Sequence, residues 1–136
     1  MIMGKLVWKD EYSVGVEMID EQHKVFVGIM NELYTAILEK KEKRVLDDVF
    51  KQLVAYTQFH FQTEERYFDE FNYEGSAEHK ASHQKLREQI AELETRKDGI
   101  MENPFELMDF LEDWLVDHIM GMDKKYGPCF KEHGLK

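Results

Sequence analysis

The sequence predicts an all-α protein: an antiparallel up-down-up-down four-helix bundle with an N-terminal arm. Four segments carry apolar residues every three or four positions, which is the period of an amphipathic helix. Short connections separate these segments, and short connections favour antiparallel neighbours. No part of the 136 residues shows the alternation of polar and apolar residues that is typical of strands.

The first two helices are expected over residues 20–40 and 44–71. Residues 1–18 show no helical period and are expected to form the arm. Asp20 is well placed to be the N-cap of the first helix, because its carboxylate can accept hydrogen bonds from the free N–H groups there. The charged residues 40–43 break the apolar pattern and separate the two helices.

The third and fourth helices are expected over residues 77–97 and 105–123. Turn residues precede the third helix, and Ser76 is a candidate for its N-cap. An Asp-Gly pair marks its end. Pro104 suits the first turn of the fourth helix, where the missing N–H has no partner to lose. The glycine and proline within residues 126–130 are expected to end regular structure.

The composition bounds the class of protein. At 136 residues, the chain is expected to form one domain, residues 1–136, with a real hydrophobic core. Its net charge of −10 argues against nucleic acid and anionic membranes as partners, since both attract clustered Lys and Arg. No apolar run approaches the roughly 20 residues that span a bilayer, and no secretory signal is evident. With Cys129 as the single cysteine and no predicted apolar interface, we expect a cytoplasmic monomer.

Histidines and a carboxylate interrupt the apolar faces of all four predicted helices. Two of these faces carry a pair four positions apart, His60 with Glu64 and His79 with His83, so that each pair shares one face. In an antiparallel bundle, the end of one helix lies beside the start of the next, which places the whole set at one end of the bundle. The set comprises His23, His60, Glu64, His79, His83 and His118.

This convergence predicts a metal site. A lone inward histidine is usually a hydrogen-bonded core residue, and His60 and Glu64 alone could satisfy each other. Five neutral imidazoles in one apolar layer would, however, leave most ring nitrogens without partners, at about 1–3 kcal/mol for each buried group. The sixth histidine, His133, lies in the polar tail and is expected to be solvated, as is Glu65 beside its inward neighbour.

Asp123 is a candidate ligand only if the fourth helix departs from α geometry. It follows His118 by five residues, which is about 140° around a regular helix axis. A π-type turn would bring the two side chains back into line, and Gly121 between them makes such a departure easier. The alternative is an ion pair between Asp123 and Lys124 or Lys125 at the helix end.

The number and type of these side chains limit which metal ions could bind and how many. Five imidazoles with one or two carboxylates exceed the four ligands of a tetrahedral zinc, and calcium or magnesium would prefer oxygen ligands. Iron, copper, nickel and zinc all accept imidazole-rich sites, and two ions bridged by carboxylates would use every ligand. The Glu-x-x-His pairs of carboxylate di-iron bundles do not occur in the sequence. The excess of imidazole over carboxylate favours reversible ligand binding over high-valent oxidation chemistry.

Four segments of the sequence together resemble the bacterial hemerythrins, a group of hemerythrin-like proteins. The segments are WKDEYSVGVEMIDEQHK, HFQTEE, HKASH and HIMGMDKKY. They supply, in this order, a histidine, H-x-x-x-E, H-x-x-x-H and H-x-x-x-x-D. Each motif alone is weak, whereas the ordered combination is specific and covers nearly the whole chain.

This resemblance implies a centre of two non-haem iron ions, bridged by an oxo or hydroxo group and by two carboxylates. Such a centre binds O2 reversibly for storage, delivery or sensing, and NO or other small anions are further candidate ligands. The iron held by only two histidines would keep an open position. By position, the implied ligands are His23, His60, Glu64, His79, His83, His118 and Asp123, with both carboxylates bridging.

Two other functions remain open on the same scaffold. One is a di-iron oxidase, peroxidase or nitric-oxide-reducing enzyme, and the other is an iron-handling module. We expect a binding protein rather than an enzyme, with at most weak oxidase or peroxidase activity. A sensor role would act through a separate partner, because no signalling module is attached.

An oxygen-binding site also needs a dry, apolar pocket, since water and protons release the bound molecule. Leu115, one turn before His118, matches a position that lies over the O2 pocket in the family. Simple core packing is the alternative role for every candidate. The predicted lining residues are Phe26, Phe59, Trp114, Leu115 and Ile119.

Overall fold

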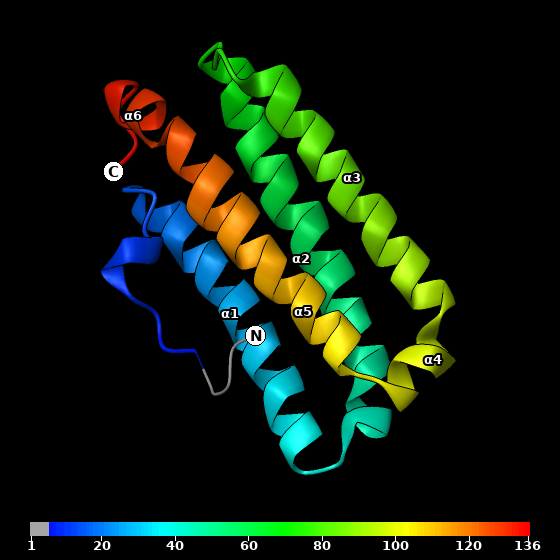
Figure 1. The fold of residues 1–136 in the computed structure, drawn as a ribbon. Helices are drawn as coiled ribbons and strands as arrows, with labels where there is room; N and C mark the ends of the chain where they lie inside the picture. Colours follow the sequence, from blue (N-terminus) through cyan, green and yellow to red (C-terminus); the bar gives the residue numbers. More distant parts are fainter. Residues whose placement is uncertain (1–5) are drawn as a thin grey trace.

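The computed structural model describes residues 6–136, except for the side chains of residues 42–44 and 101. Four long helical segments run alternately up and down (Figure 1). The described part contains no strand, and the predicted fold class is confirmed. The elements are η1 (Asp10–Tyr12), α1 (Glu17–Leu38), α2 (Glu42–Glu70), α3 (Ser76–Thr95), α4 (Lys97–Glu102), α5 (Phe105–Asp113), the π-helical η2 (Trp114–Asp123) and α6 (Lys124–Glu132).

The arm before α1 packs along the bundle rather than extending away from it (Figure 1). Its first five residues lie outside the described part. At Leu6, the backbone N–H donates to Asn31 Oδ1 at 2.8 Å, and the Leu6 carbonyl accepts from Asn31 Nδ2 at 2.8 Å. Asp20 is not the N-cap of α1, which begins at Glu17. Its carboxylate instead accepts hydrogen bonds from the Ser13 hydroxyl at 2.5 Å and from the Val14 N–H at 2.9 Å, and so holds the arm.

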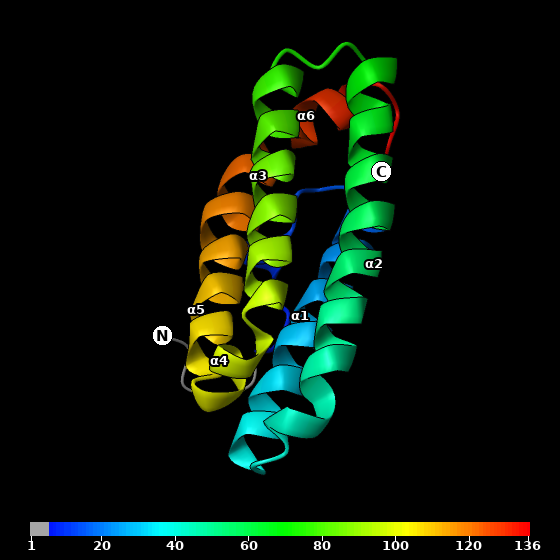
Figure 2. The same ribbon diagram turned by 90° about the vertical axis from the view of Figure 1, so that its right-hand side faces the viewer.

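The connections at both ends of α2 are tight. Lys40 and Asn72 adopt positive φ angles of 57° and 51°, a conformation for which asparagine is better suited than most residues. Ser76 is the first residue of α3 and makes no capping hydrogen bond, so its predicted N-cap role is wrong. The helical course also continues past the predicted end of this helix as the short α4, which Figure 2 shows at the lower end of the bundle.

Regular structure does not end within residues 126–130, because α6 spans them with Pro128 inside the helix. Proline removes one helical hydrogen bond, but packing against the arm holds this turn in place. Gly127 lies so close to the Val14 carbonyl oxygen that any Cβ there would overlap it. The position of α6 therefore depends on tertiary contacts, which the local sequence does not predict.

The interior contains two hydrophobic clusters. The large cluster fills the bundle from Phe26 and Trp114 down to Leu46 and Ile100. A smaller one, which we call the cap cluster, closes the opposite end and consists of Val14, Val16, Ile19, Phe68, Tyr126 and Phe130. Along α1 and α2, the predicted ligands fall between residues of the cap cluster and residues deep in the large cluster. Among residues 6–136, no helix is both long and apolar enough to cross a membrane.

Candidate metal centre

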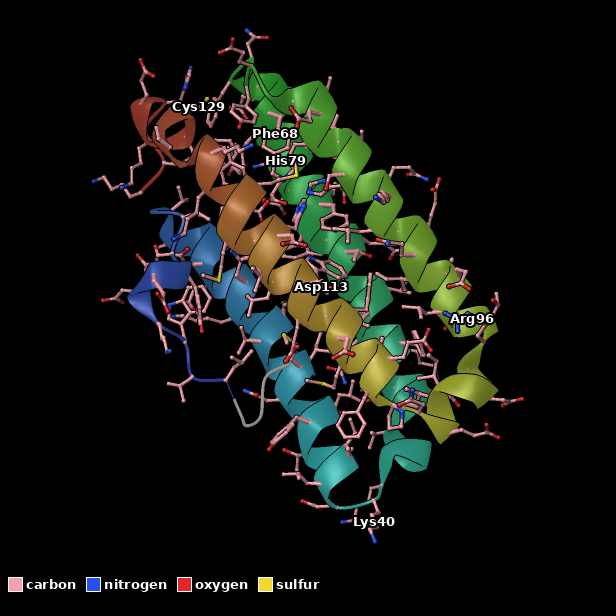
Figure 3. The ribbon with its side chains drawn as sticks, viewed as in Figure 1. Lys40, Phe68, His79, Arg96, Asp113 and Cys129 are labelled. Atoms are coloured by element: carbon pink, nitrogen blue, oxygen red, sulfur yellow. The ribbon has the colours of Figure 1, made fainter. Side chains whose placement is uncertain are left out.

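Five histidines and two carboxylates form a fully internal polar layer between the two clusters. Helix α1 contributes one histidine, α2 a histidine and a glutamate, α3 two histidines, and η2 a histidine and an aspartate. Figure 3 shows His79 beside Phe68 at the end of the bundle opposite Lys40. At most 4% of any of these residues is exposed: His23, His60, Glu64, His79, His83, His118 and Asp123.

The layer divides into two groups that share their carboxylates. In each group, ligand atoms from all members lie within 4.8 Å of one another. The larger group combines Glu64 and Asp123 with three histidines, and the smaller combines the same carboxylates with only two. The three histidines are His79, His83 and His118, and the two are His23 and His60. The structure thus brings together all seven predicted ligands, in the division expected for two neighbouring cations.

Each carboxylate contacts histidines of both groups. Asp123 Oδ1 lies 2.7 Å from His79 Nε2 and 3.2 Å from His118 Nε2, while its Oδ2 lies 2.9 Å from His23 Nε2. Glu64 has the same relation to the other two histidines. Its Oε1 lies 3.2 Å from the Nε2 of His60 and 3.1 Å from that of His83. Both carboxylates are therefore placed to bridge.

These short contacts are not hydrogen bonds. The Nε2 atoms of all five histidines and all four carboxylate oxygens are buried without a hydrogen-bond partner. Leaving such groups unpaired costs about 1–3 kcal/mol each. Nitrogen and oxygen atoms that converge without bonding to each other fit a shared cation at the centre of each group. Imidazole with carboxylate is a donor set that iron accepts.

The protonation states of the side chains favour the same interpretation. Burial raises the pKa of Glu64 to about 8, lowers the pKa of His83 to about 4 and holds the pKa of His60 well below its usual range. Burial would also raise the pKa of Asp123, but the neighbouring histidines, His118 foremost, outweigh it and hold that pKa well below its usual range. Neutral imidazoles such as those of His60 and His83 offer free lone pairs, and a bound cation would supply the positive charge that keeps both carboxylates ionised.

A second set of contacts orients three of the five imidazoles. In each, the outer ring nitrogen meets an oxygen that can accept its N–H, which leaves Nε2 free for a cation. The contacts are His60 Nδ1 to Gln22 Oε1 at 2.6 Å, His83 Nδ1 to Glu65 Oε2 at 2.8 Å, and His118 Nδ1 to Ser82 Oγ at 3.0 Å.

Glu65 is the clearest correction to the sequence interpretation, which left it solvated. Its side chain is only 25% exposed and accepts a hydrogen bond from His83, while Arg87 Nη2 lies 3.4 Å from the same oxygen. The signal was present in the sequence. Arg87 follows His83 by one helical turn, so both side chains lie on the same face of α3. An acidic residue on the facing helix can therefore pair with the arginine and accept a hydrogen bond from the histidine.

The helix that carries His118 is π-helical over ten residues, Trp114–Asp123, which is the departure from α geometry that Asp123 needed to be a ligand. Hydrogen bonds in a π-helix join residues five apart, so His118 and Asp123 stack on one side. The alternative role of Asp123, an ion pair at the helix end, is excluded by its complete burial beside the histidines.

The predicted pocket residues divide four to one. Phe26, Trp114, Leu115 and Ile119 are at most 2% exposed and belong to the large cluster beside the polar layer. Phe59 is 63% exposed, so its prediction is wrong. It precedes His60 by one residue, which turns it about 100° away from the ligand face.

Phe61, rather than the predicted Phe59, is the buried aromatic residue next to His60. Its ring stacks on that of His83, with centroids 3.8 Å apart and planes inclined by 5°, and lies 5.9 Å from Trp114. Because α2 packs against both α1 and α3, its buried face is wide enough to include the residue after His60.

Comparisons with known proteins agree with this arrangement. Residues 14–130 match the profile of the hemerythrin HHE cation binding domain. The bacteriohemerythrin of Stenotrophomonas maltophilia (strain R551-3) is 32% identical over 131 residues, which cover 96% of this chain and 85% of the relative. That of Methylococcus capsulatus (strain Bath) is 32% identical over 93% of this chain and 98% of its own length. The crystal structure of a wild-type hemerythrin superposes with a TM-score of 0.72 at 31% identity, over 91% of this chain and 96% of that chain.

Proposed function

The chain belongs to the hemerythrin family, and we propose that it binds O2 reversibly at a non-haem di-iron centre. The observation that carries this proposal is the pair of buried ligand groups that share two carboxylates. When bound, two iron ions would supply the electrons that hold oxygen. The chain would serve in storage, delivery or sensing of oxygen, as a binding protein in the cytoplasm rather than an enzyme.

The unequal groups assign the roles of the ligands. His79, His83 and His118 would hold one iron, while His23 and His60 would hold the other and leave it open to O2, NO or a small anion. Glu64 and Asp123 would bridge the two ions, because each contacts histidines of both groups. An oxo or hydroxo group from solvent would be the third bridge.

The side chains around the two-histidine group support retention of the bound molecule. Phe26 and Trp114 both contact the ring of Tyr56, which stacks on His60, and Leu115 and Ile119 are buried in the same hydrophobic cluster. An apolar wall excludes the water and protons that would release the ligand as a reduced product. We therefore assign these four residues to the oxygen pocket.

Cycles of gas exchange test the proposed function. The iron-loaded protein is reduced under anaerobic conditions, exposed to O2 and then evacuated, while its optical and resonance Raman spectra are recorded. We expect a coloured form that appears with O2 and disappears under vacuum, with the O2 recovered intact. Oxygen consumed with turnover would indicate an oxidase, and no spectral change would overturn the proposal.

A pair of histidine variants provides the control for this experiment. His23→Ala removes a ligand of the two-histidine group and should abolish the coloured form. His133→Ala removes the exposed histidine of the tail, whose ring stacks only on Phe71 at the surface, and should leave the gas cycle intact. Equal behaviour of the two variants would contradict the assigned site.

A further inference from the structure

Tyr56 has a buried hydroxyl without a hydrogen-bond partner. The residue is 6% exposed, and its Oη is fully enclosed by the protein. Tyr56 lies one helical turn before His60 on α2, and the two rings stack with centroids 5.1 Å apart and planes inclined by 18°. This contact places the phenol beside the two-histidine group.

The other neighbours of the ring belong to the proposed oxygen pocket. Phe26 lies 5.6 Å from the Tyr56 ring centroid and Trp114 lies 6.2 Å from it. Apart from the indole N–H of Trp114, which is also buried without a hydrogen-bond partner, these neighbours are apolar. Of the two polar groups, only the Tyr56 hydroxyl belongs to a ring that stacks on a histidine of the two-histidine group. A ligand on the two-histidine group would therefore lie close to the Tyr56 ring and its aromatic neighbours.

A phenol in this position is a ready hydrogen-bond donor. The ordinary pKa of a phenol is about 10, so the hydroxyl carries a proton that it can donate at neutral pH. A buried donor without a partner is unfavourable by about 1–3 kcal/mol, whereas a phenylalanine would fill the same space without that penalty. The hydroxyl is therefore explained best by a partner that arrives with the ligand.

We propose that the Tyr56 hydroxyl donates a hydrogen bond to the small ligand bound at the two-histidine group. The pocket would then favour ligands that present an acceptor atom or a negative charge away from the metal, and Tyr56 would determine ligand specificity. This inference rests on the proposed function, because it requires the metal centre.

Azide is a suitable probe, since it is a small anion with a free acceptor end. Its dissociation constant is measured by optical titration of the oxidised, iron-loaded protein. We expect Tyr56→Phe to weaken azide binding about tenfold, the effect of one lost hydrogen bond. Equal affinity in the wild type and in Tyr56→Phe would overturn the inference.

Tyr126→Phe is the matched control. Tyr126 is also fully buried, but its ring lies 5.6 Å from His79, in the three-histidine group, and its hydroxyl neighbours the Glu64 carboxylate. Azide affinity should change less than twofold in this variant. If both variants weakened azide equally, the effect of Tyr56→Phe would be a general response to a lost buried hydroxyl, and the inference would fail.

Urea unfolding of the metal-free protein gives a readout that does not depend on the centre. Because the Tyr56 hydroxyl has no partner in the protein, Tyr56→Phe should leave the unfolding midpoint unchanged or raise it. A lower midpoint would mean that the hydroxyl is structural, which contradicts the inference. Wild-type protein that binds neither azide nor O2 would overturn the proposed function as well, whereas reversible O2 binding with unchanged azide affinity in Tyr56→Phe would overturn the inference alone.

Discussion

The half of the bundle interior far from the cap cluster is mostly apolar, whereas the layer beneath the cap cluster is built from imidazoles and carboxylates. In the apolar half, Leu33, Leu46, Phe50, Leu53 and Leu111 are completely buried and contact one another. Burial of such side chains contributes roughly 1.5–3 kcal/mol each and needs no further component. This region therefore needs no partner from outside the chain for its stability.

The polar layer is stable only with a partner from outside the chain. Its inward nitrogens and oxygens have no hydrogen bonds, and burial pushes the pKa values of Glu64 and His83 in opposite directions. Such a layer would be selected against if stability alone mattered, because apolar residues of similar volume would pack there more favourably. The difference between the two regions indicates that the apolar half stabilises the fold, whereas the polar layer is kept for function.

The largest effect is expected from a substitution in the apolar half. Phe50→Ala should lower the free energy of unfolding by about 3–5 kcal/mol, because it leaves a cavity at a fully buried site. Urea unfolding measures the loss, and iron per folded chain should not change. The control is Val54→Ala, at a position that is 36% exposed, with an expected loss of about 0.5 kcal/mol or less. A folded Phe50→Ala protein that fails to take up iron would break the separation of the two regions.

Substitution of a bridging carboxylate should lower iron affinity and leave the fold intact. Asp123→Asn removes a negative charge that contacts three histidines, so iron affinity should fall more than the roughly 100-fold typical of residues that only support a ligand. The helical circular dichroism should be retained. Asp117→Asn, at an exposed position of the same segment, should leave iron binding unchanged. Iron titration of the metal-free proteins compares the two variants, and equal affinity would rule out a bridging role.

A smaller loss is expected when only the orientation of a ligand is disturbed. Glu65→Gln keeps the size of the side chain but weakens the acceptor for the His83 N–H, so iron affinity should fall about 10- to 100-fold. The same iron titration measures this loss. Glu70→Gln, an exposed change on the same helix, is the control. Unaltered iron affinity in Glu65→Gln would show that the hydrogen bond to His83 has no role in metal binding.

The smallest expected change affects retention of oxygen rather than metal binding. Leu115→Tyr introduces a hydroxyl where the apolar cluster meets the polar layer, so the oxygenated form should convert several-fold faster to the oxidised form. Val116→Tyr places the same side chain at a position that is 55% exposed and should have no effect. Optical spectra followed over time give both rates, and identical rates would remove Leu115 from the pocket.

Helical periodicity made most of the centre predictable. Ligands such as His79 and His83 lie one turn apart on an inward face, and the antiparallel topology brings the four helices to one end. The spacing between His118 and Asp123 left two possibilities, a π-type turn or an ion pair at the helix end, and the structure has the first. These features depend on local geometry, which a sequence encodes directly.

The failures involve contacts between segments far apart in the sequence. Phe59 and Phe61 flank His60, and only the positions of α1 and α3 decide which of them is buried. Glu65 reads as an exposed residue until α3 brings His83 to it. Residues 126–130 stay helical because Gly127 packs against the arm. Periodicity gives the buried face of a helix to within one residue, and packing decides the rest.

The iron content of the chain tests the central claim most directly. The metal-free protein is loaded with Fe(II) under anaerobic conditions, freed of unbound metal and measured by elemental analysis against protein concentration. Two ligand groups that share Glu64 and Asp123 predict two irons per chain. One iron, or a single zinc in its place, would contradict a centre of two bridged irons.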